Sequence, residues 1–192
     1  MSTTTGKVVI ISGPSGAGKS TLVRRLLETC PLPLALSVSA TTRNPRPDEQ
    51  DGIAYHFLSE AEFESKRLAG EFLEYKEVFG QGHWYGTLED NITRGLEKGD
   101  WVILEIDVAG AMSVIDRIPD AITIFITPGS MEELENRLRN RQTDSEQAII
   151  RRLDVAIEEM SKSNIYQYKV ENNDLTVATE QVSQILQALE NQ

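Results

Sequence analysis

Residues 8–20 read VVIISGPSGAGKS, and this stretch decides the fold. The run at 8–11 is β-branched and apolar throughout, which is typical of a strand buried on both faces of a parallel sheet. A glycine-rich loop follows, and the apolar stripe over 20–28 predicts a helix directly behind it. A strand, a glycine loop and a helix in this order predict the first unit of an α/β domain.

The loop fits the pattern G-x-x-x-x-G-K-[ST] in full. Its glycines let successive backbone N–H groups face one phosphate, and the helix N-terminus behind them adds about half a positive charge. In such a loop the lysine reaches the β- and γ-phosphates and the serine hydroxyl ligates Mg²⁺. The alternative is a glycine turn with a helix-capping serine, which the agreement of pattern, strand and helix disfavours. The predicted triphosphate site comprises Gly13, Pro14, Ser15, Gly16, Ala17, Gly18, Lys19, Ser20 and Thr21.

Strand-like and helical segments alternate through the rest of the chain. The alternating pattern at 36–40 predicts a strand, and buried strands are expected at 101–106 and 122–126. Helices are expected near 109–118, 130–140, 145–160 and 179–189. This alternation predicts one α/β domain with a parallel sheet flanked by helices and with right-handed crossovers. The stretch from 54 to 87 departs from it, because aromatic-rich, strand-like pieces surround a helical piece at 60–68. We expect a small α+β insertion there.

Length, charge and cysteine content exclude several classes of protein. The 192 residues suffice for one domain with a sizeable core. The formal net charge of −11 makes the chain a poor candidate for coating nucleic acid, which favours a basic surface. A single cysteine rules out an intrachain disulfide, and no apolar stretch approaches the roughly 18 residues of a membrane span. The N-terminus lacks the charged region of a signal peptide, so we expect a cytoplasmic protein without membrane or nucleic-acid partners.

A pair of arginines follows the second expected strand. Arg43 and Arg46 lie three residues apart in a segment that Pro45 and Pro47 stiffen. Guanidinium groups bind phosphate in bidentate fashion and keep their charge. In so acidic a chain the pair favours anion capture, with two solvated loop arginines as the alternative.

Two further features indicate phosphate chemistry. Glu105 and Asp107 end a buried-strand run, and carboxylates at a strand end beside a phosphate loop suit a role in holding Mg²⁺ or its waters. Their two-residue spacing predicts that both line the cleft from one strand face, with a helix cap as the alternative for Asp107. Five of the twelve arginines fall within 137–152, as a lid that closes over a triphosphate requires.

Five motifs together resemble the guanylate kinase family. They are GPSGAGKST at 13–21, SVSATTRNPR at 37–46, EFLEYKEVF at 71–79, YGT at 85–87 and LEIDVAGA at 104–111. The resemblance runs from about residue 7 to the final helix. It implies a P-loop nucleotide kinase that transfers the γ-phosphate of ATP to GMP, and to dGMP as well, giving ADP and GDP in purine nucleotide metabolism. It also implies a core of about 5–38, 88–126 and 160–192, a GMP-binding insertion of about 39–87 and a lid of about 137–155.

The resemblance further implies roles for individual residues. The implied GMP site comprises Ser39, Arg43, Arg46, Tyr55, Glu74, Tyr85, Thr87, Glu105 and Asp107. Within it the two arginines and two tyrosines would hold the phosphate, and the serine, Glu74 and the threonine would read the guanine. One carboxylate can accept from guanine N1–H and N2–H₂ together, whereas adenine would leave it unpaired.

The resemblance also implies residues for catalysis, for ATP binding and for Mg²⁺. The implied catalytic residues are Lys19, Arg43, Arg137, Arg141 and Arg152; Asn172 would lie near the adenine of ATP, and Ser20 and Asp107 would bind Mg²⁺. No protein base is required, because the GMP phosphate is already an anionic oxygen nucleophile.

Two other functions stay open at this point. A P-loop kinase could act on another acceptor, such as a ribose bisphosphate, and a guanylate-kinase-like module could bind protein ligands without catalysis. Intact Glu74 and Thr87 favour guanine, and intact Lys19 and Ser20 favour an enzyme. The absence of an N-K-x-D motif argues against a switch GTPase.

Overall fold

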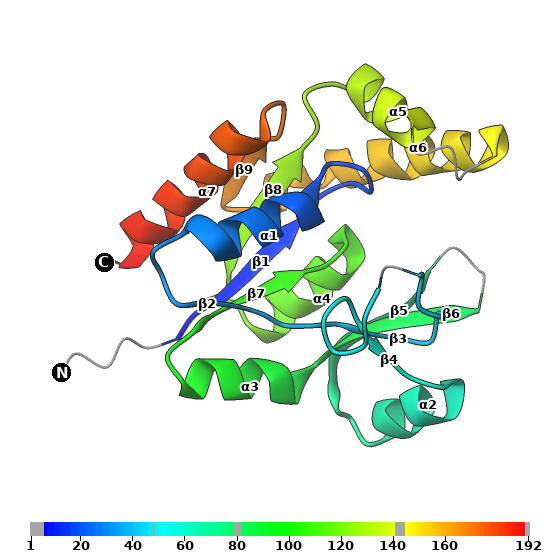
Figure 1. Cartoon of the computed structure of the whole chain (residues 1–192), viewed down its shortest axis with the longest axis vertical. Helices are drawn as coiled ribbons and strands as arrows, with labels where there is room; N and C mark the ends of the chain where they lie inside the picture. Colours follow the sequence, from blue (N-terminus) through cyan, green and yellow to red (C-terminus); the bar gives the residue numbers. More distant parts are fainter. Residues whose placement is uncertain (1–5, 48, 79–81, 141–144, 191–192) are drawn as a thin grey trace.

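A parallel sheet forms the centre of the computed structural model, which describes residues 6–47, 49–78, 82–140 and 145–190. Its five strands lie in the order β2-β7-β1-β8-β9, all parallel (Figure 1). The strands are β1 (Val8–Ser12), β2 (Leu34–Leu36), β7 (Trp101–Glu105), β8 (Ile122–Thr127) and β9 (Tyr168–Glu171). The expected α/β fold with a parallel sheet is confirmed, and the run at 8–11 is its central strand.

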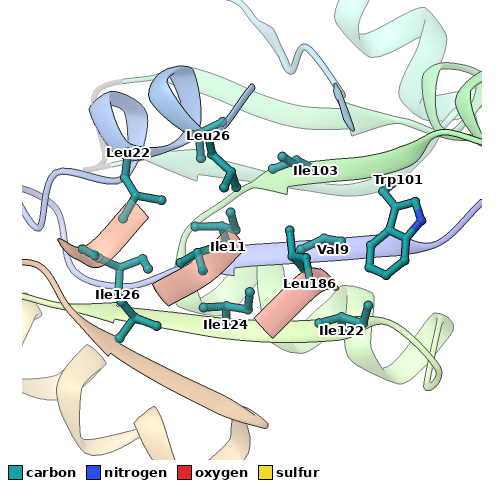
Figure 2. Close-up of a cluster of buried hydrophobic side chains, with 14 of the residues drawn as sticks. Val9, Ile11, Leu22, Leu26, Trp101, Ile103, Ile122, Ile124, Ile126 and Leu186 are labelled. Atoms are coloured by element: carbon teal, nitrogen blue, oxygen red, sulfur yellow. The ribbon is translucent and has the colours of Figure 1, made fainter. Parts of the chain in front are cut away.

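Helices cover both faces of this sheet, which explains why the whole of β1 is buried. The helices α1 (Lys19–Thr29) and α7 (Leu175–Glu190) pack with the odd-numbered side chains of β1, Val9 and Ile11, around a cluster that Figure 2 shows. The helices α3 (Glu89–Glu97) and α4 (Val108–Arg117) contribute to the opposite cluster, with Val8 and Ile10. Side chains of a strand alternate between the two faces of its sheet, so both sets must be apolar here.

A second, smaller sheet carries the expected insertion. Its order is β4-β3-β6-β5, from β3 (Ala40–Thr41), β4 (His56–Phe57), β5 (Phe72–Val78) and β6 (His83–Leu88). Helix α2 (Glu60–Leu68) begins at a capping box of Ser59 and Glu62 and packs Phe63 against Phe72, with ring centroids 4.4 Å apart. The helix has the bounds that the sequence predicts.

Two further helices lie on the side of the β1–α1 loop that faces away from the small sheet (Figure 1). They are α5 (Met131–Asn140) and α6 (Glu146–Ser161), followed by a short 3₁₀ turn at Ser163–Ile165. Leu134 and Leu138 of α5 pack with Ile149 and Ala156 of α6 in a cluster of their own. The two leucines also reach Gly16 of the phosphate loop, where a Cβ atom would lie 2.8 Å from Leu134.

The expected strand over 36–40 is wrong in its middle. The structure divides this stretch between β2 of the central sheet and β3 of the small sheet, and residues 37–39 form no strand. The polar segment between them carries the chain from one sheet to the other. Helix α3 and strand β9 are present without having been predicted. Within the described ranges, every helix is too short or too polar to span a lipid bilayer.

Candidate active site

The phosphate loop lies at the carboxyl end of β1, the edge of an α/β sheet where ligands bind. Gly13, Gly16 and Gly18 all have positive φ angles, and a Cβ atom on Gly13 would lie 2.1 Å from the carbonyl oxygen of Ile126. Only glycine satisfies both conditions at this point. Gly18 caps α1 without any side-chain hydrogen bond, which leaves the first N–H groups of the helix available to bind an anion.

Side chains from distant segments brace this loop. Lys19 folds back over it and donates from Nζ to the carbonyl oxygens of Gly13 at 2.6 Å and Pro14 at 3.1 Å. Arg152 of α6 donates from Nη2 to Ser15 Oγ at 2.7 Å. This contact ties the proposed lid directly to the loop.

Asn172 and Arg137 hold the loop from behind. The Asn172 amide is buried and donates to the carbonyl oxygen of Ala17 at 2.7 Å. Arg137 donates to the carbonyl oxygens of Asn172 at 2.7 Å and of Ala17 at 3.4 Å, and it pairs with Glu133. Both residues therefore support the loop in this structure rather than line its cleft.

One cleft of about 640 Å³ joins the phosphate loop to the small sheet. It brings together most residues that the sequence predicts: Gly13, Ser15, Gly16, Gly18, Lys19, Ser20, Thr21, Ser39, Arg46, Tyr55, Glu74, Tyr85, Glu105, Asp107 and Arg152. Predicted site residues that do not line it are Pro14, Ala17, Arg43, Thr87, Arg137 and Asn172. Arg141 lies outside the described residues.

The small sheet presents a partly buried carboxylate, that of Glu74, to the cleft. Glu74 of β5 pairs in register with Thr87 of β6, whose hydroxyl donates to Glu74 Oε1 at 2.6 Å. Burial raises the pKa of Glu74, and the hydrogen bond from Thr87 opposes part of that rise. Gly110 lies against this carboxylate, since a Cβ atom there would be 3.0 Å from Glu74 Oε2. A base that offers paired N–H donors would find its acceptor here.

Arg43 lies beside this carboxylate site, in the loop after β3. Its two terminal nitrogens each donate to Glu49 at 2.9 Å, and its Nε donates to the hydroxyl of Tyr85 at 3.1 Å. The guanidinium stands 5.5 Å from the centre of the Tyr55 ring. The hydrogen bond to Glu49 raises the pKa of Arg43 and holds that of Glu49 below its ordinary value. The arrangement is a rigid fork that already carries an anionic group.

The acidic side of the cleft lies between the phosphate loop and α4. Ser20 donates from Oγ to Glu105 Oε1 at 2.5 Å. Asp107 accepts from the N–H of Gly110 at 2.7 Å and caps α4. The expectation that both carboxylates line the cleft is confirmed, but their common strand face is wrong because β7 ends at Glu105. Asp107 is thus a helix cap and a cleft residue at once.

Three cleft or near-cleft residues were missed in the sequence. Glu49 pairs with Arg43, Lys76 reaches Asp107 across the cleft, and Glu159 is a partly buried carboxylate of α6. Among the residues that the structure describes, none forms a hydrogen bond with Glu159 Oε2, and burial raises the pKa of this carboxyl group. Its only sequence signal is its position two helical turns after Arg152, on the same face of a helix.

Comparison with known proteins now decides the family. A family model described as guanylate kinase matches residues 5–189. The chain belongs to the guanylate kinase family. A guanylate kinase of Rhodopirellula baltica is 55% identical over 183 residues, which cover 94% of this chain and 87% of that protein. A guanylate kinase of Caldanaerobacter subterraneus subsp. tengcongensis is 45% identical over 181 residues, covering 94% and 86%.

A solved structure agrees with this assignment. The crystal structure of guanylate kinase from Anaplasma phagocytophilum superposes with a TM-score of 0.79 at 32% identity, covering 98% of this chain and 88% of the other. As a guanylate kinase, the chain is an enzyme that phosphorylates GMP at the expense of ATP.

Proposed function

We propose that the chain transfers the γ-phosphate of ATP to GMP with the phosphate loop as donor site and the small sheet as acceptor site. The observation that carries this division is the carboxylate of Glu74, which Thr87 holds from behind, in the same cleft as most of the phosphate loop. We further propose cytoplasmic purine nucleotide metabolism as its setting, with ATP and GMP as its partners, dGMP as a second acceptor, and no nucleic-acid or membrane partner.

The donor site would hold the triphosphate through backbone N–H groups and Lys19. An Mg²⁺ ion fits beside it, because Ser20 and Asp107 offer oxygen ligands. No group of three His, Cys, Asp or Glu side chains in the described ranges could hold a metal alone, so the phosphates would share the ion. When bound, Mg²⁺ neutralises charge on the phosphates.

The acceptor site would read guanine and phosphate separately. Glu74 would accept from N1–H and N2–H₂ of guanine, and the hydroxyl of Ser39 would supply a donor for O6. The hydroxyl of Thr87 donates to Glu74 in this structure and would have to turn from it to donate to O6. Adenine has no N1–H, so AMP would leave the largely desolvated carboxylate of Glu74 without the two donors of the base. The phosphate would be held by Arg43, Arg46, Tyr55 and Tyr85, three of which line the cleft.

Transfer would then require positioning and neutralisation of charge rather than a protein base. The phosphate of GMP attacks in line, and cations around the transferring group stabilise the transition state. Lys19 and Arg152 already lie at the loop, and Arg137 and Arg141 would join them from α5 and the segment beyond it. Closure over the nucleotides would keep water from the reaction.

A coupled assay of ADP release tests this function. Mg-ATP is offered with GMP, dGMP, AMP, UMP or CMP, each alone. Strong turnover with GMP, weaker turnover with dGMP and little with AMP, UMP or CMP are expected. ATP binding without turnover on any of the five would contradict the acceptor assignment, and would favour a ribose bisphosphate acceptor or a binding role. Equal turnover with AMP would contradict the role of Glu74.

A further inference from the structure

Lys76 is a lysine of the small sheet. It lies within the motif at 71–79, but neither the resemblance nor the proposed transfer assigns it a role. It lies near the end of β5, and its side chain lines the cleft that joins the small sheet to the phosphate loop. Its ammonium reaches across that cleft to the core, where Nζ lies 3.1 Å from Asp107 Oδ2. The two residues belong to β5 and to the cap of α4, two elements that contact each other.

The strand register places Lys76 next to the phosphate-binding part of the acceptor site. Glu74 pairs with Thr87, the proposed guanine contacts, and Lys76 pairs with Tyr85, a proposed phosphate contact. Residues two apart on a strand share one face, and directly opposed residues of an antiparallel pair have Cβ atoms about 5 Å apart. Lys76 therefore lies two residues along β5 from the proposed guanine contact Glu74 and directly opposite the proposed phosphate contact Tyr85.

Electrostatics also favours an anionic ligand at Lys76. The same cleft holds the carboxylates of Glu74, Glu105, Asp107 and Glu159, so a phosphate entering it meets strong repulsion unless cations stand close by. Stability is a weak explanation for the ion pair with Asp107, since both side chains are over a third exposed and such pairs contribute little. The lysine is long and rotatable, so its ammonium can turn from Asp107 to a phosphate oxygen.

We propose that Lys76 is a further acceptor-binding residue, which contacts the phosphate of the bound nucleoside monophosphate and screens it from Asp107. The inference rests on the acceptor site proposed above. With the nucleotide absent, Asp107 holds the ammonium in the cleft. With the nucleotide bound, the phosphate dianion competes for that ammonium and outweighs a single carboxylate.

The test compares binding of GMP with binding of guanosine, which has the same base and ribose but no phosphate. Isothermal titration calorimetry on the full chain, without ATP, gives both dissociation constants. For Lys76→Met we expect GMP to bind about tenfold more weakly and guanosine to bind within twofold of the parent. Lys76→Arg, which keeps the charge, should restore most of the lost GMP affinity.

Two control variants separate the possible causes. Lys66→Met removes the same charge from the same insertion, where Lys66 pairs with Glu71 at 2.7 Å outside this cleft, and should leave both affinities unchanged. Arg43→Met removes a proposed phosphate contact and should weaken GMP but spare guanosine. Thermal unfolding of each variant checks that the fold is kept.

Each pattern of results decides the matter. If Arg43→Met weakens GMP selectively and Lys76→Met does not, Lys76 is no phosphate contact and the acceptor site stands. If Lys76→Met weakens the binding of GMP and of guanosine equally, Lys76 acts only through its ion pair with Asp107 and the proposal is overturned. If neither variant distinguishes the two ligands, the phosphate site itself has been placed wrongly. If Lys66→Met lowers the affinity for GMP as much as Lys76→Met does, the effect comes from the change in net charge, and the proposal is also overturned.

Discussion

The phosphate loop and the acceptor site meet in one cleft, but they are built by opposite means. The loop is shaped by backbone, with glycines pressed against the carbonyl of Ile126 and the side chain of Leu134. The proposed acceptor site is made of side chains on a small sheet, and the buried members of that sheet's own cluster among the described residues are Ala40, Phe63 and Phe72. The geometry of the phosphate loop is thus set by the core of the molecule, whereas the proposed acceptor specificity would depend on side-chain charges that can be changed without altering the fold.

Substitutions of glycine should show the largest difference between the phosphate loop and the insertion. At Gly13, φ is +142° and a Cβ atom would meet backbone, so Gly13→Ala should lose more than about 3 kcal/mol of unfolding free energy and abolish ATP binding. At Gly52 of the insertion, φ is +74° with nothing within 4 Å, so Gly52→Ala should cost only about 1 kcal/mol. Urea unfolding measures both. Equal costs would contradict a loop fixed by its surroundings.

Loss of the loop lysine should separate chemistry from acceptor binding. Lys19→Met removes a cation from the donor site, so turnover should fall about 10²- to 10³-fold. Binding of GMP alone should stay within twofold of the parent, because Lys19 lies at the donor end of the cleft. Steady-state kinetics and calorimetry test the two statements. A parallel fall in GMP affinity would show that the sites are not independent.

The Arg43–Glu49 pair should reveal how far the acceptor site is held by charge. Glu49→Gln weakens both hydrogen bonds to Arg43 and should cost about 1–3 kcal/mol of unfolding free energy at neutral pH. The pKa of Glu49 lies below its ordinary 4.5 in the folded chain, so its stabilisation is complete above pH 4.5 and is lost as the pH falls further. The parent should therefore lose more stability below pH 4.5 than Glu49→Gln. Parallel acid-unfolding curves would contradict this.

The smallest expected effect is a pH dependence of base recognition. Burial raises the pKa of Glu74 above its ordinary 4.5, and only the ionised carboxylate can accept both guanine donors. Guanosine affinity should thus fall on acidification, beginning above pH 4.5 and approaching tenfold per pH unit below the raised pKa. Guanosine is the correct probe because phosphate groups titrate near pH 6 themselves. An identical pH profile for Glu74→Gln would assign the titration to another group.

The sequence predicts what local pattern determines. The phosphate loop, its strand and its helix follow one another directly, and α2 carries its own capping box, so both are located from the sequence alone. The strand expected at 36–40 fails because alternation alone does not show that the chain changes sheets after Leu36.

Tertiary pairing accounts for the residues that the sequence does not reveal. Lys76 and Asp107 lie 31 residues apart, and no spacing rule joins an ammonium in the insertion to a cap of α4. Glu49 follows Arg46 by three residues, but nothing in that spacing shows that it would pair with Arg43. Asn172 and Arg137 are named by the resemblance, but their hydrogen bonds to the phosphate loop from distant segments are not visible in the sequence. Such partners become visible only when the sheets are assembled.

The independence of the two sites is tested most directly by Glu74→Gln. Glutamine keeps the shape of the side chain but places a donor where guanine needs an acceptor. We predict that kcat/KM for GMP falls at least about 100-fold and that the preference for GMP over AMP narrows, while the Kd for Mg-ATP stays within twofold of the parent. Unchanged kinetics with GMP, or a loss of ATP affinity that parallels the loss with GMP, would contradict this account. It holds that backbone forms the donor site and side chains form an independent acceptor site.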